Sequence, residues 1–266
     1  MQTLHEDLFL EYRPDTLQAV RKLYDMDKAG SMDEAINIIE EWIKKQKHFT
    51  NKEFGKEYLE RLIIASKGSV ERTKNRLDKI CTSRNLVPEF IATINVKEFK
   101  PIPAFVDLFL PKLTPDHDRV YMLKFVGKEL NKCSLLDLYK RGILEAFGVR
   151  FKALHLLTPS RVVDTLVTFL KLLTGQKMGD RFIVNSTLET LYEFMPKEVL
   201  PYKYGGEAKP YLKLQEDFHE ALSSKEFIEY MMKTKDYKTD ESLRSVDKFK
   251  EQYMGIPGTF RNINLD

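Results

Sequence analysis

The chain has 266 residues, of which 42% are hydrophobic and 31% are charged. Lysine and arginine number 43 against 40 aspartates and glutamates, so the formal net charge is only +3. A charge so close to zero argues against a general nucleic-acid-binding protein, and any anion site must be a local patch. The 12 glycines and 11 prolines fit a helix-rich globular protein better than a disordered or collagen-like one.

Cysteine usage and the N-terminal residues predict a cellular compartment. Cys81 and Cys133 form no C-x-x-C pair, so we expect reduced thiols and no thiolate metal site. The first residues are acidic and lack the pattern of a secretory signal, and no apolar run approaches the roughly 18 residues of a membrane span. These features predict a soluble, cytoplasmic protein.

Residues from about Pro14 to Phe90 are predicted to form a bundle of short helices. A capping residue stands at the expected start of three helices, with glutamate three residues later in the first two: Ser31 with Glu34, Thr50 with Glu53, and Ser69. Apolar residues then recur at three- and four-residue steps along the first helix: Ala35, Ile36, Ile39, Trp42 and Ile43. Such stripes must be buried against one another.

The next part of the chain predicts an α/β fold. Prolines between residues 100 and 115 forbid a continuous helix and indicate a connector: Pro101, Pro103, Pro111 and Pro115. Three apolar runs of strand length follow: Arg119–Phe125, Val149–Leu157 and Arg181–Asn185. They alternate with three helix-like stretches: Ser134–Phe147, Pro159–Leu173 and Ser186–Met195. This alternation favours a mainly parallel sheet that is flanked by helices.

Sequence motifs of common enzymes are absent. There is no P-loop, dinucleotide-binding fingerprint, H-E-x-x-H motif or nucleophile elbow. The five histidines are scattered singly, and His155, in an expected strand, fits a packing residue better than a catalytic base. We therefore expect no catalytic residue, metal or cofactor, and no enzyme activity.

Four cations next to the expected strands form a candidate anion site. Arg150 and Lys152 alternate with apolar residues, so both cations point to one face of a strand. Lys177 and Arg181 lie four residues apart where the next strand begins. Parallel strands begin at the same edge, where these cations could bind a phosphate headgroup. Spacing alone favours the alternative of separate, solvated surface charges.

The stretch after the last expected strand places apolar residues on one helix face: Leu188, Leu191, Tyr192 and Met195. This face fits either a helix that packs on the core or a mobile lid over an apolar cavity, and periodicity does not separate the two.

The order of residues from Arg119 to Gly206 resembles the CRAL-TRIO lipid-binding family. The motifs that carry the resemblance are Gly148–Leu157, Ser186–Leu191 and Pro196–Glu207, which ends in Tyr-Gly-Gly-Glu. Four further segments resemble the N-terminal helical domain and the tail of the insect-type members: Ile38–Gln46, Glu71–Asp78, Asn85–Phe90 and Gly255–Arg261. The resemblance implies an N-terminal helical domain at 1–100, a lipid-binding domain at 101–206 and a C-terminal helical segment at 207–266.

The resemblance also implies a function, the binding and intracellular transfer of a small hydrophobic lipid such as a tocopherol or a retinoid. The lipid would lie in a cavity beneath a gate helix at Ser186–Val199. The implied pocket and gate residues are Leu154, Leu156, Ile183, Leu188, Leu191, Tyr192 and Met195. In the family's tocopherol carrier a basic cleft binds phosphatidylinositol bisphosphate, and its cations match Arg150, Lys152, Lys177 and Arg181. Arg61 is the one match in the arginine-rich helix, and the implied location is cytoplasmic and peripheral at membranes.

One departure from the family shortens the expected sheet. Leu135–Gly142 runs almost directly into Leu144–Gly148, so that one β-α unit of roughly 30 residues is missing. The absent strand would supply part of the cavity wall. The alternative function is therefore a non-carrier interaction or scaffold protein, whose shortened sheet forms no complete lipid pocket.

Overall fold

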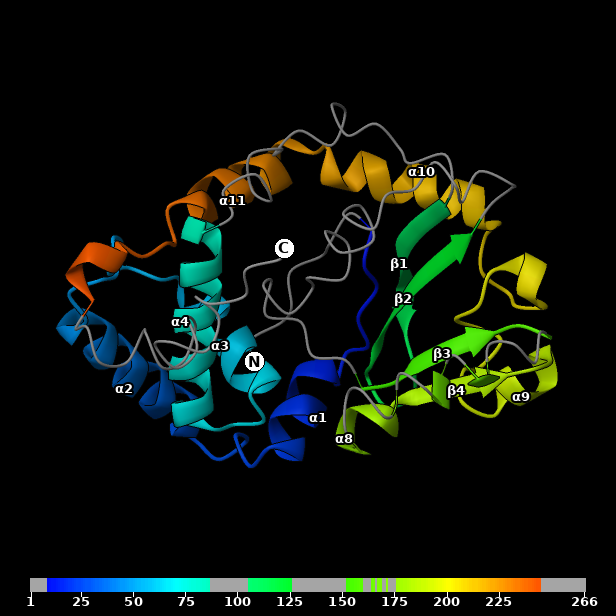
Figure 1. Cartoon of the computed structure of the whole chain (residues 1–266), viewed down its shortest axis with the longest axis horizontal. Helices are drawn as coiled ribbons and strands as arrows, with labels where there is room; N and C mark the ends of the chain where they lie inside the picture. Colours follow the sequence, from blue (N-terminus) through cyan, green and yellow to red (C-terminus); the bar gives the residue numbers. More distant parts are fainter. Residues whose placement is uncertain are drawn as a thin grey trace, which may run out of the picture. The chain divides into compact units, whose positions relative to one another are not determined.

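The computed structural model describes residues 9–86, 105–125, 152–159, 164–165, 167–168, 171 and 176–244 (Figure 1). Within these residues the fold is mixed α/β, which agrees with the expected class at that coarse level. The chain divides into two compact units. The first holds the described residues of 9–27, 105–125 and 152–230, and the second holds 28–86 and 231–244. The predicted division at residues 100 and 206 stays a prediction.

Three helices build most of the second unit. They are α2 (Ser31–Lys45), α3 (Lys56–Ala65) and α4 (Val70–Leu86), and each packs against the other two. The predicted stripe of α2 is confirmed, since Ile39 and Ile43 are fully buried. Burying a side chain of this size contributes about 1.5 to 3 kcal/mol, so the stripe is a main source of stability for this unit. Cys81 of α4 is a free, buried thiol, and burial raises its pKa.

The helix starts confirm one predicted cap and correct two. The Ser69 hydroxyl accepts a hydrogen bond from the amide of Arg72 at 3.3 Å, as expected. The Ser31 prediction is wrong, because Ser31 is already the first residue of α2 and the capping position is Gly30, in the left-handed conformation with φ 82°. The Thr50 prediction is also wrong. Its hydroxyl donates to the carbonyl of Lys238 at 2.9 Å, far along the chain. Helix α3 begins only at Lys56, with Gly55 at the capping position, so Thr50 does not cap it.

A C-terminal segment, residues 231–244, completes the second unit. It contains the end of α11 (Lys225–Lys235) and the 3-10 helix η5 (Glu241–Leu243). Tyr237 is 2% exposed, and its ring lies 4.5 Å from that of Phe54 and 5.2 Å from that of Tyr58. The helices of the second unit therefore share their core with a segment more than 140 residues further along the chain.

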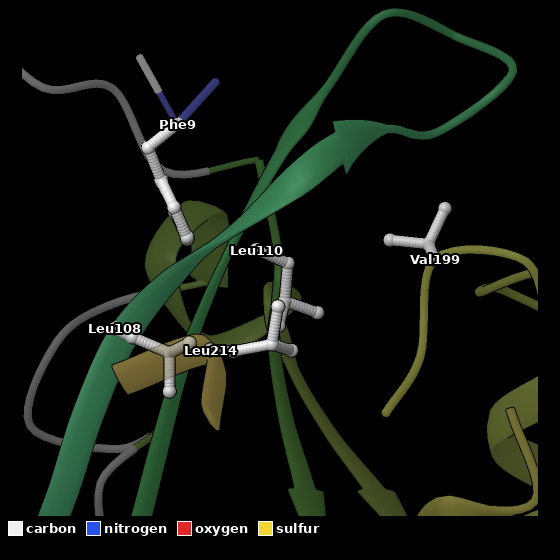
Figure 2. Packing of buried hydrophobic residues seen from close by; sticks show 5 residues of the cluster. All are labelled: Phe9, Leu108, Leu110, Val199 and Leu214. Carbon is white, nitrogen blue, oxygen red and sulfur yellow. The ribbon is translucent and has the colours of Figure 1, made fainter. Parts of the chain in front are cut away.

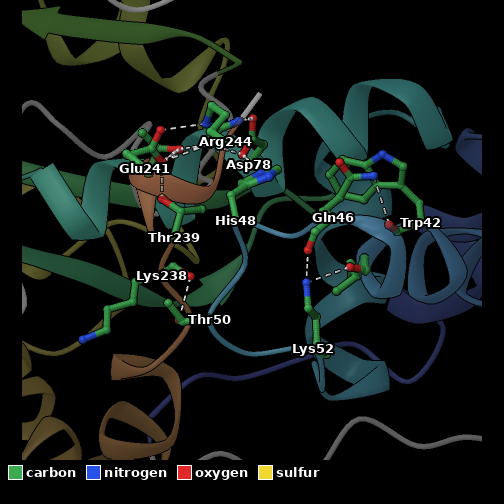
Figure 3. Close-up of polar contacts among 12 residues, drawn as sticks. Trp42, Gln46, His48, Thr50, Lys52, Asp78, Lys238, Thr239, Glu241 and Arg244 are labelled. Atoms are coloured by element: carbon green, nitrogen blue, oxygen red, sulfur yellow. Dashed lines mark hydrogen bonds and ion pairs between the residues drawn. The ribbon is translucent and has the colours of Figure 1, made fainter. Parts of the chain in front are cut away.

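A partly buried polar network joins this segment to α4 (Figure 3). Arg244, whose side chain is 8% exposed, donates to both carboxylate oxygens of Asp78 at 2.7 and 2.8 Å and to Glu241 at 2.7 Å. His48 Nε2 lies 3.0 Å from the same Asp78 carboxylate. Burial alone would raise the pKa of Asp78, but hydrogen bonds from His48 and Arg244 outweigh it and hold the pKa below its usual value. The Asp78 carboxylate is therefore ionised at neutral pH, where it pairs with Arg244.

The first sheet of the first unit corrects the predicted connector. Strand β1 (Phe105–Leu113) pairs antiparallel with β2 (Arg119–Phe125), whose bounds are those predicted. Pro111 lies in β1 where the register is irregular, between Phe109 and Leu113. A proline has no amide to donate, and an irregularity in a strand tolerates it. The prolines therefore exclude a helix, as expected, but not a strand.

The second sheet is parallel and confirms part of the predicted topology. Strand β3 (Leu154–Leu157) pairs with β4 (Phe182–Asn185), and both are shorter than the apolar runs that predicted them. Helix α8 (Gln176–Gly179) precedes β4. The described residues thus form two two-stranded sheets rather than one mainly parallel sheet. The expected helix at Ser134–Phe147 lies outside the described residues, as does much of the one at Pro159–Leu173.

The core of the first unit lies between β1 and helix α10 (Tyr211–Leu222) (Figure 2). Its buried members are Phe9, Leu108, Leu110, Val199 and Leu214. Helix α1 (Thr16–Leu23) belongs to this unit and not to the helical bundle, so the bundle predicted from Pro14 begins later. The preceding residues are attached to β1, because the Glu11 amide donates to the Pro111 carbonyl at 2.8 Å.

Candidate functional site

The candidate lipid site lies where β3, β4 and helix α9 (Leu188–Tyr192) meet (Figure 1). Thr187 caps α9, since its hydroxyl accepts a hydrogen bond from the amide of Thr190. The helix is shorter than the predicted Ser186–Met195 stretch. Leu191 is buried, while Leu188, Tyr192 and Met195 are partly buried. The two strands and α9 form the only part of the first unit that matches the expected strand–gate arrangement within the described residues.

The register of β3 and β4 distributes the predicted pocket residues over two faces. Leu154 pairs with Phe182 and His155 with Ile183, and paired residues point to the same face of a sheet. One face therefore carries Leu154, Leu156, Phe182 and Val184. The other face carries His155, Leu157, Ile183 and Asn185. Of the predicted pocket residues in the strands, Ile183 thus lies on the face opposite to that of Leu154 and Leu156.

Both faces expose apolar side chains. Leu154 is 39% exposed on one face, and Leu157 is 37% exposed on the other. Phe194, which follows α9, is 50% exposed, and its ring lies 4.9 Å from the ring of His155. On the face of His155, the exposed side chains of Leu157 and Phe194 are suited to contact with an apolar molecule.

A polar pair interrupts the apolar face of His155. Asn185 is 1% exposed at the end of β4, and its Nδ2 lies 3.2 Å from His155 Nδ1. Within the described part of the chain, Asn185 Oδ1 accepts no hydrogen bond. Burial lowers the pKa of His155, which favours the neutral imidazole. Nδ1 then accepts from Asn185, and the ring proton is carried by Nε2.

The loop at residues 196–208, after α9, is closely packed. The Tyr192 hydroxyl donates to the Tyr204 carbonyl at 2.8 Å, and the Glu207 amide donates to the Lys197 carbonyl at 2.9 Å. Gly205 has φ +67°, a conformation that favours glycine. A side chain at Gly206 would collide with the Leu200 carbonyl. The Tyr-Gly-Gly-Glu motif therefore has a structural role in fixing the end of the predicted gate.

The candidate anion site contains a lysine, Lys152, that is already paired with carboxylates. Lys152 Nζ lies 2.6 Å from the Asp118 carboxylate and 3.2 Å from that of Asp116, in the turn between β1 and β2. Hydrogen bonding to Asp118, and then to Asp116, raises the pKa of Lys152. Its charge is thus offset within the protein. The sequence analysis did not identify either aspartate as a partner of Lys152, because they lie more than 30 positions away and only the fold brings them together.

Of the remaining predicted cations, Arg181 and Arg61 are described, whereas Lys177 and Arg150 are not fully described. The Arg181 carbonyl accepts a hydrogen bond from the Leu154 amide at 2.7 Å. Leu154 follows Lys152 by two residues, so the main chain of Arg181 lies close to that of Lys152. Lys177 lies in α8, but its side chain is outside the described part, as is all of Arg150. Arg61 lies on α3 of the second unit, where it is largely exposed and 3.8 Å from Glu57. The structure thus brings together the main chains around Lys152 and Arg181.

Other kinds of site find no support among the described residues. Within them no three histidines, cysteines or carboxylates are grouped to hold a metal ion. Their helices are all too short or too polar to cross a membrane. An open hollow in the second unit is lined by polar residues and would not suit an apolar ligand: Thr50, Asn51, Lys52, Glu53, Asp236 and Lys238.

Comparisons with known proteins cover parts of the chain. Residues 28–100, which include α2, α3 and α4, match the family described as "Pinta-like, UBA domain". The chain is also similar to "Alpha-tocopherol transfer protein-like" of Mus musculus, Homo sapiens and Pongo abelii, with 33% identity over 69 residues in each case. The match covers 25% of this chain and 20% of each relative, so the chain matches about a fifth of the length of these relatives. This partial similarity is in keeping with the CRAL-TRIO resemblance of the motifs.

Proposed function

We propose that this protein binds a small apolar lipid and transfers it between membranes, without chemical change to the lipid. The observation that carries the proposal is the similarity to the three alpha-tocopherol transfer protein-like relatives. The names of these relatives make a tocopherol-like molecule the first ligand to test, and a retinoid-like molecule would need the same kind of apolar surface. The proposed place of action is the cytoplasm, with peripheral binding to membranes.

The surface of β3, β4 and α9 supports the proposal physically. Leu157 and Phe194 together present apolar area at one face, and α9, whose Leu191 is buried, packs against both strands. Transfer of a lipid from water to such a surface contributes about 0.8 kcal/mol for each buried CH₂ group. A ligand of about ten buried carbons would thus gain on the order of 8 kcal/mol before the entropic cost of binding.

Phosphoinositide recognition is a second part of the proposal. It assigns the headgroup to Arg150, Lys152, Lys177 and Arg181, with Arg61 as a further cation. Lys152 is held by Asp116 and Asp118, so an anionic headgroup would have to replace these carboxylates. Each cation near an anionic surface contributes roughly 1 kcal/mol, which makes this exchange nearly balanced and sensitive to salt.

A transfer assay tests the lipid part of the proposal. Donor vesicles that contain a fluorescent tocopherol analogue are mixed with acceptor vesicles, and the protein should raise the rate of transfer. Leu157→Asp places a charge on the proposed apolar face and should abolish the effect, whereas Ile38→Asp changes an exposed apolar residue of α2 in the second unit and should not. Transfer that the protein does not accelerate would contradict the proposal.

The alternative, an interaction protein without a lipid pocket, is favoured by the same exposure of Leu154 and Phe194. These side chains can contact a protein partner as well as a lipid. Native mass spectrometry of the purified chain separates the two functions. A lipid that is retained in the complex supports carriage, and a chain that carries no lipid but associates with itself supports the alternative.

A further inference from the structure

Asn185 is a buried side chain whose oxygen has no hydrogen-bond donor among the described residues. It is 1% exposed, its Nδ2 is paired with His155 Nδ1 at 3.2 Å, and its Oδ1 receives no hydrogen bond from the described residues. A buried acceptor without a donor costs a protein about 1 to 3 kcal/mol, so it is usually satisfied or functional. The bond to His155 accounts for the amide nitrogen of this asparagine but not for its oxygen, which has no donor among the described residues.

The position of Asn185 in the sheet points to a ligand. It is the last residue of β4, paired with Leu157, the last residue of the parallel neighbour β3. Ligands of parallel α/β sheets bind beyond the carboxyl ends of the strands. Apolar side chains lie around this end, with Leu157 on the same face and Phe194 against the His155 ring. An acceptor surrounded by apolar groups selects a mainly apolar molecule that has one donor.

We propose that Asn185 is the polar end of the lipid site, where its Oδ1 accepts a hydrogen bond from a hydroxyl group of the ligand. This inference rests on the proposed function and specifies its ligand class as apolar alcohols or phenols. His155 is a positioning residue. Its Nδ1 accepts from Asn185 Nδ2, and this contact fixes the amide so that its nitrogen, and not Oδ1, faces the ring.

The experiment is a competition between two probes, hexadecanol and its methyl ether. The alcohol can donate a hydrogen bond, and the ether cannot, because a methyl group replaces its hydroxyl proton. Equal amounts are added to the full-length protein, and native mass spectrometry measures the ratio of the two complexes. The unchanged protein should prefer the alcohol about tenfold, the ratio expected for one buried hydrogen bond. In Asn185→Leu the preference should disappear while the ether still binds. Leu157→Ala, the matched control on the same face, should weaken both probes by the same factor.

The outcomes separate this inference from the proposed function. Equal binding of alcohol and ether to the unchanged protein overturns the inference and leaves lipid binding intact. A preference that persists in Asn185→Leu also overturns it, because another group then reads the hydroxyl. If neither probe binds the unchanged protein, the proposed function fails and the inference fails with it. The comparison of probes on the unchanged protein does not depend on whether a variant folds.

Discussion

Each unit of this protein contains a histidine that is hydrogen-bonded to a polar side chain, partly buried in one unit and fully buried in the other, and the two pairs differ in completeness. In the second unit, His48 and Arg244 together supply donors to both oxygens of Asp78. In the first unit, Asn185 bonds to His155 through its nitrogen, and its oxygen has no donor among the described residues. A complete network fixes a structure, whereas an incomplete one keeps an acceptor for a ligand. We therefore expect the first arrangement to stabilise its unit, and the second is the one for which we propose binding.

The largest expected effect comes from breaking the complete network. Arg244→Ala leaves Asp78 and Glu241 without their main donor and should lower the free energy of unfolding by about 3 to 5 kcal/mol. Urea unfolding followed by the fluorescence of Trp42, the single tryptophan, reports on this unit. Lys44→Ala removes only an exposed ion pair with Glu41 and should leave the curve unchanged. A loss under about 1 kcal/mol in Arg244→Ala would contradict the role of the network.

A smaller effect is expected from the loop that fixes the end of the predicted gate. Gly206→Ala forces the Leu200 carbonyl to move and should lower the local stability of residues 196–208 by about 1 to 3 kcal/mol. Amide hydrogen exchange measured by mass spectrometry gives this local stability. Gly55→Ala is the control, because an added methyl group there has open space and φ is −63°. Unchanged exchange in Gly206→Ala would show that the loop is not a rigid support.

The paired lysine offers a gain of function. Replacing Asp116 and Asp118 with asparagine frees the charge of Lys152 and should strengthen binding to vesicles with phosphatidylinositol bisphosphate about fivefold, the equivalent of roughly 1 kcal/mol. Flotation of the protein with the vesicles measures the binding. Vesicles of phosphatidylcholine alone should show no gain. If the variant and the original chain bind the anionic vesicles equally, Lys152 is not part of a headgroup site.

The smallest effect concerns the pH dependence of the incomplete pair. Burial places the pKa of His155 in the folded state below its unfolded value, so the neutral form stabilises the fold. That contribution is present above about pH 6.5 and is lost as the pH falls below it. The ordinary pKa of a histidine is about 6.5. NMR of the imidazole carbon-bound protons should show that the pKa of His155 lies below this value. Titration at or above that value would contradict the neutral imidazole that Asn185 requires.

Local patterns predicted local structure well. The stripe of Ile39 and Ile43 in α2 and the bounds of β2 follow from periodicity within a few residues, and both are confirmed. Pro111 misled because the rule against proline in a helix says nothing of a strand with an irregular register. The Thr50 cap failed because Lys238, its true partner, lies far along the chain.

The candidate site shows the same limit. The sequence identified Lys152 as a cation but not its pairing with Asp118, since only the fold brings the turn and the strand together. It also treated His155 as a packing residue and did not consider Asn185, because neither residue belongs to a catalytic or metal motif. A buried acceptor without a donor is a property of the three-dimensional packing, and no spacing in the sequence reveals it.

The most direct test of lipid binding is methyl NMR of the protein with and without an apolar alcohol. Leucine and isoleucine methyl groups report on both units at once. The account predicts shifts for Leu157 and Ile183, on the face of Asn185, with no shifts for Ile39 and Ile43 in the core of the second unit. Shifts confined to the second unit, or no shifts in either, would contradict a lipid site between β3, β4 and α9.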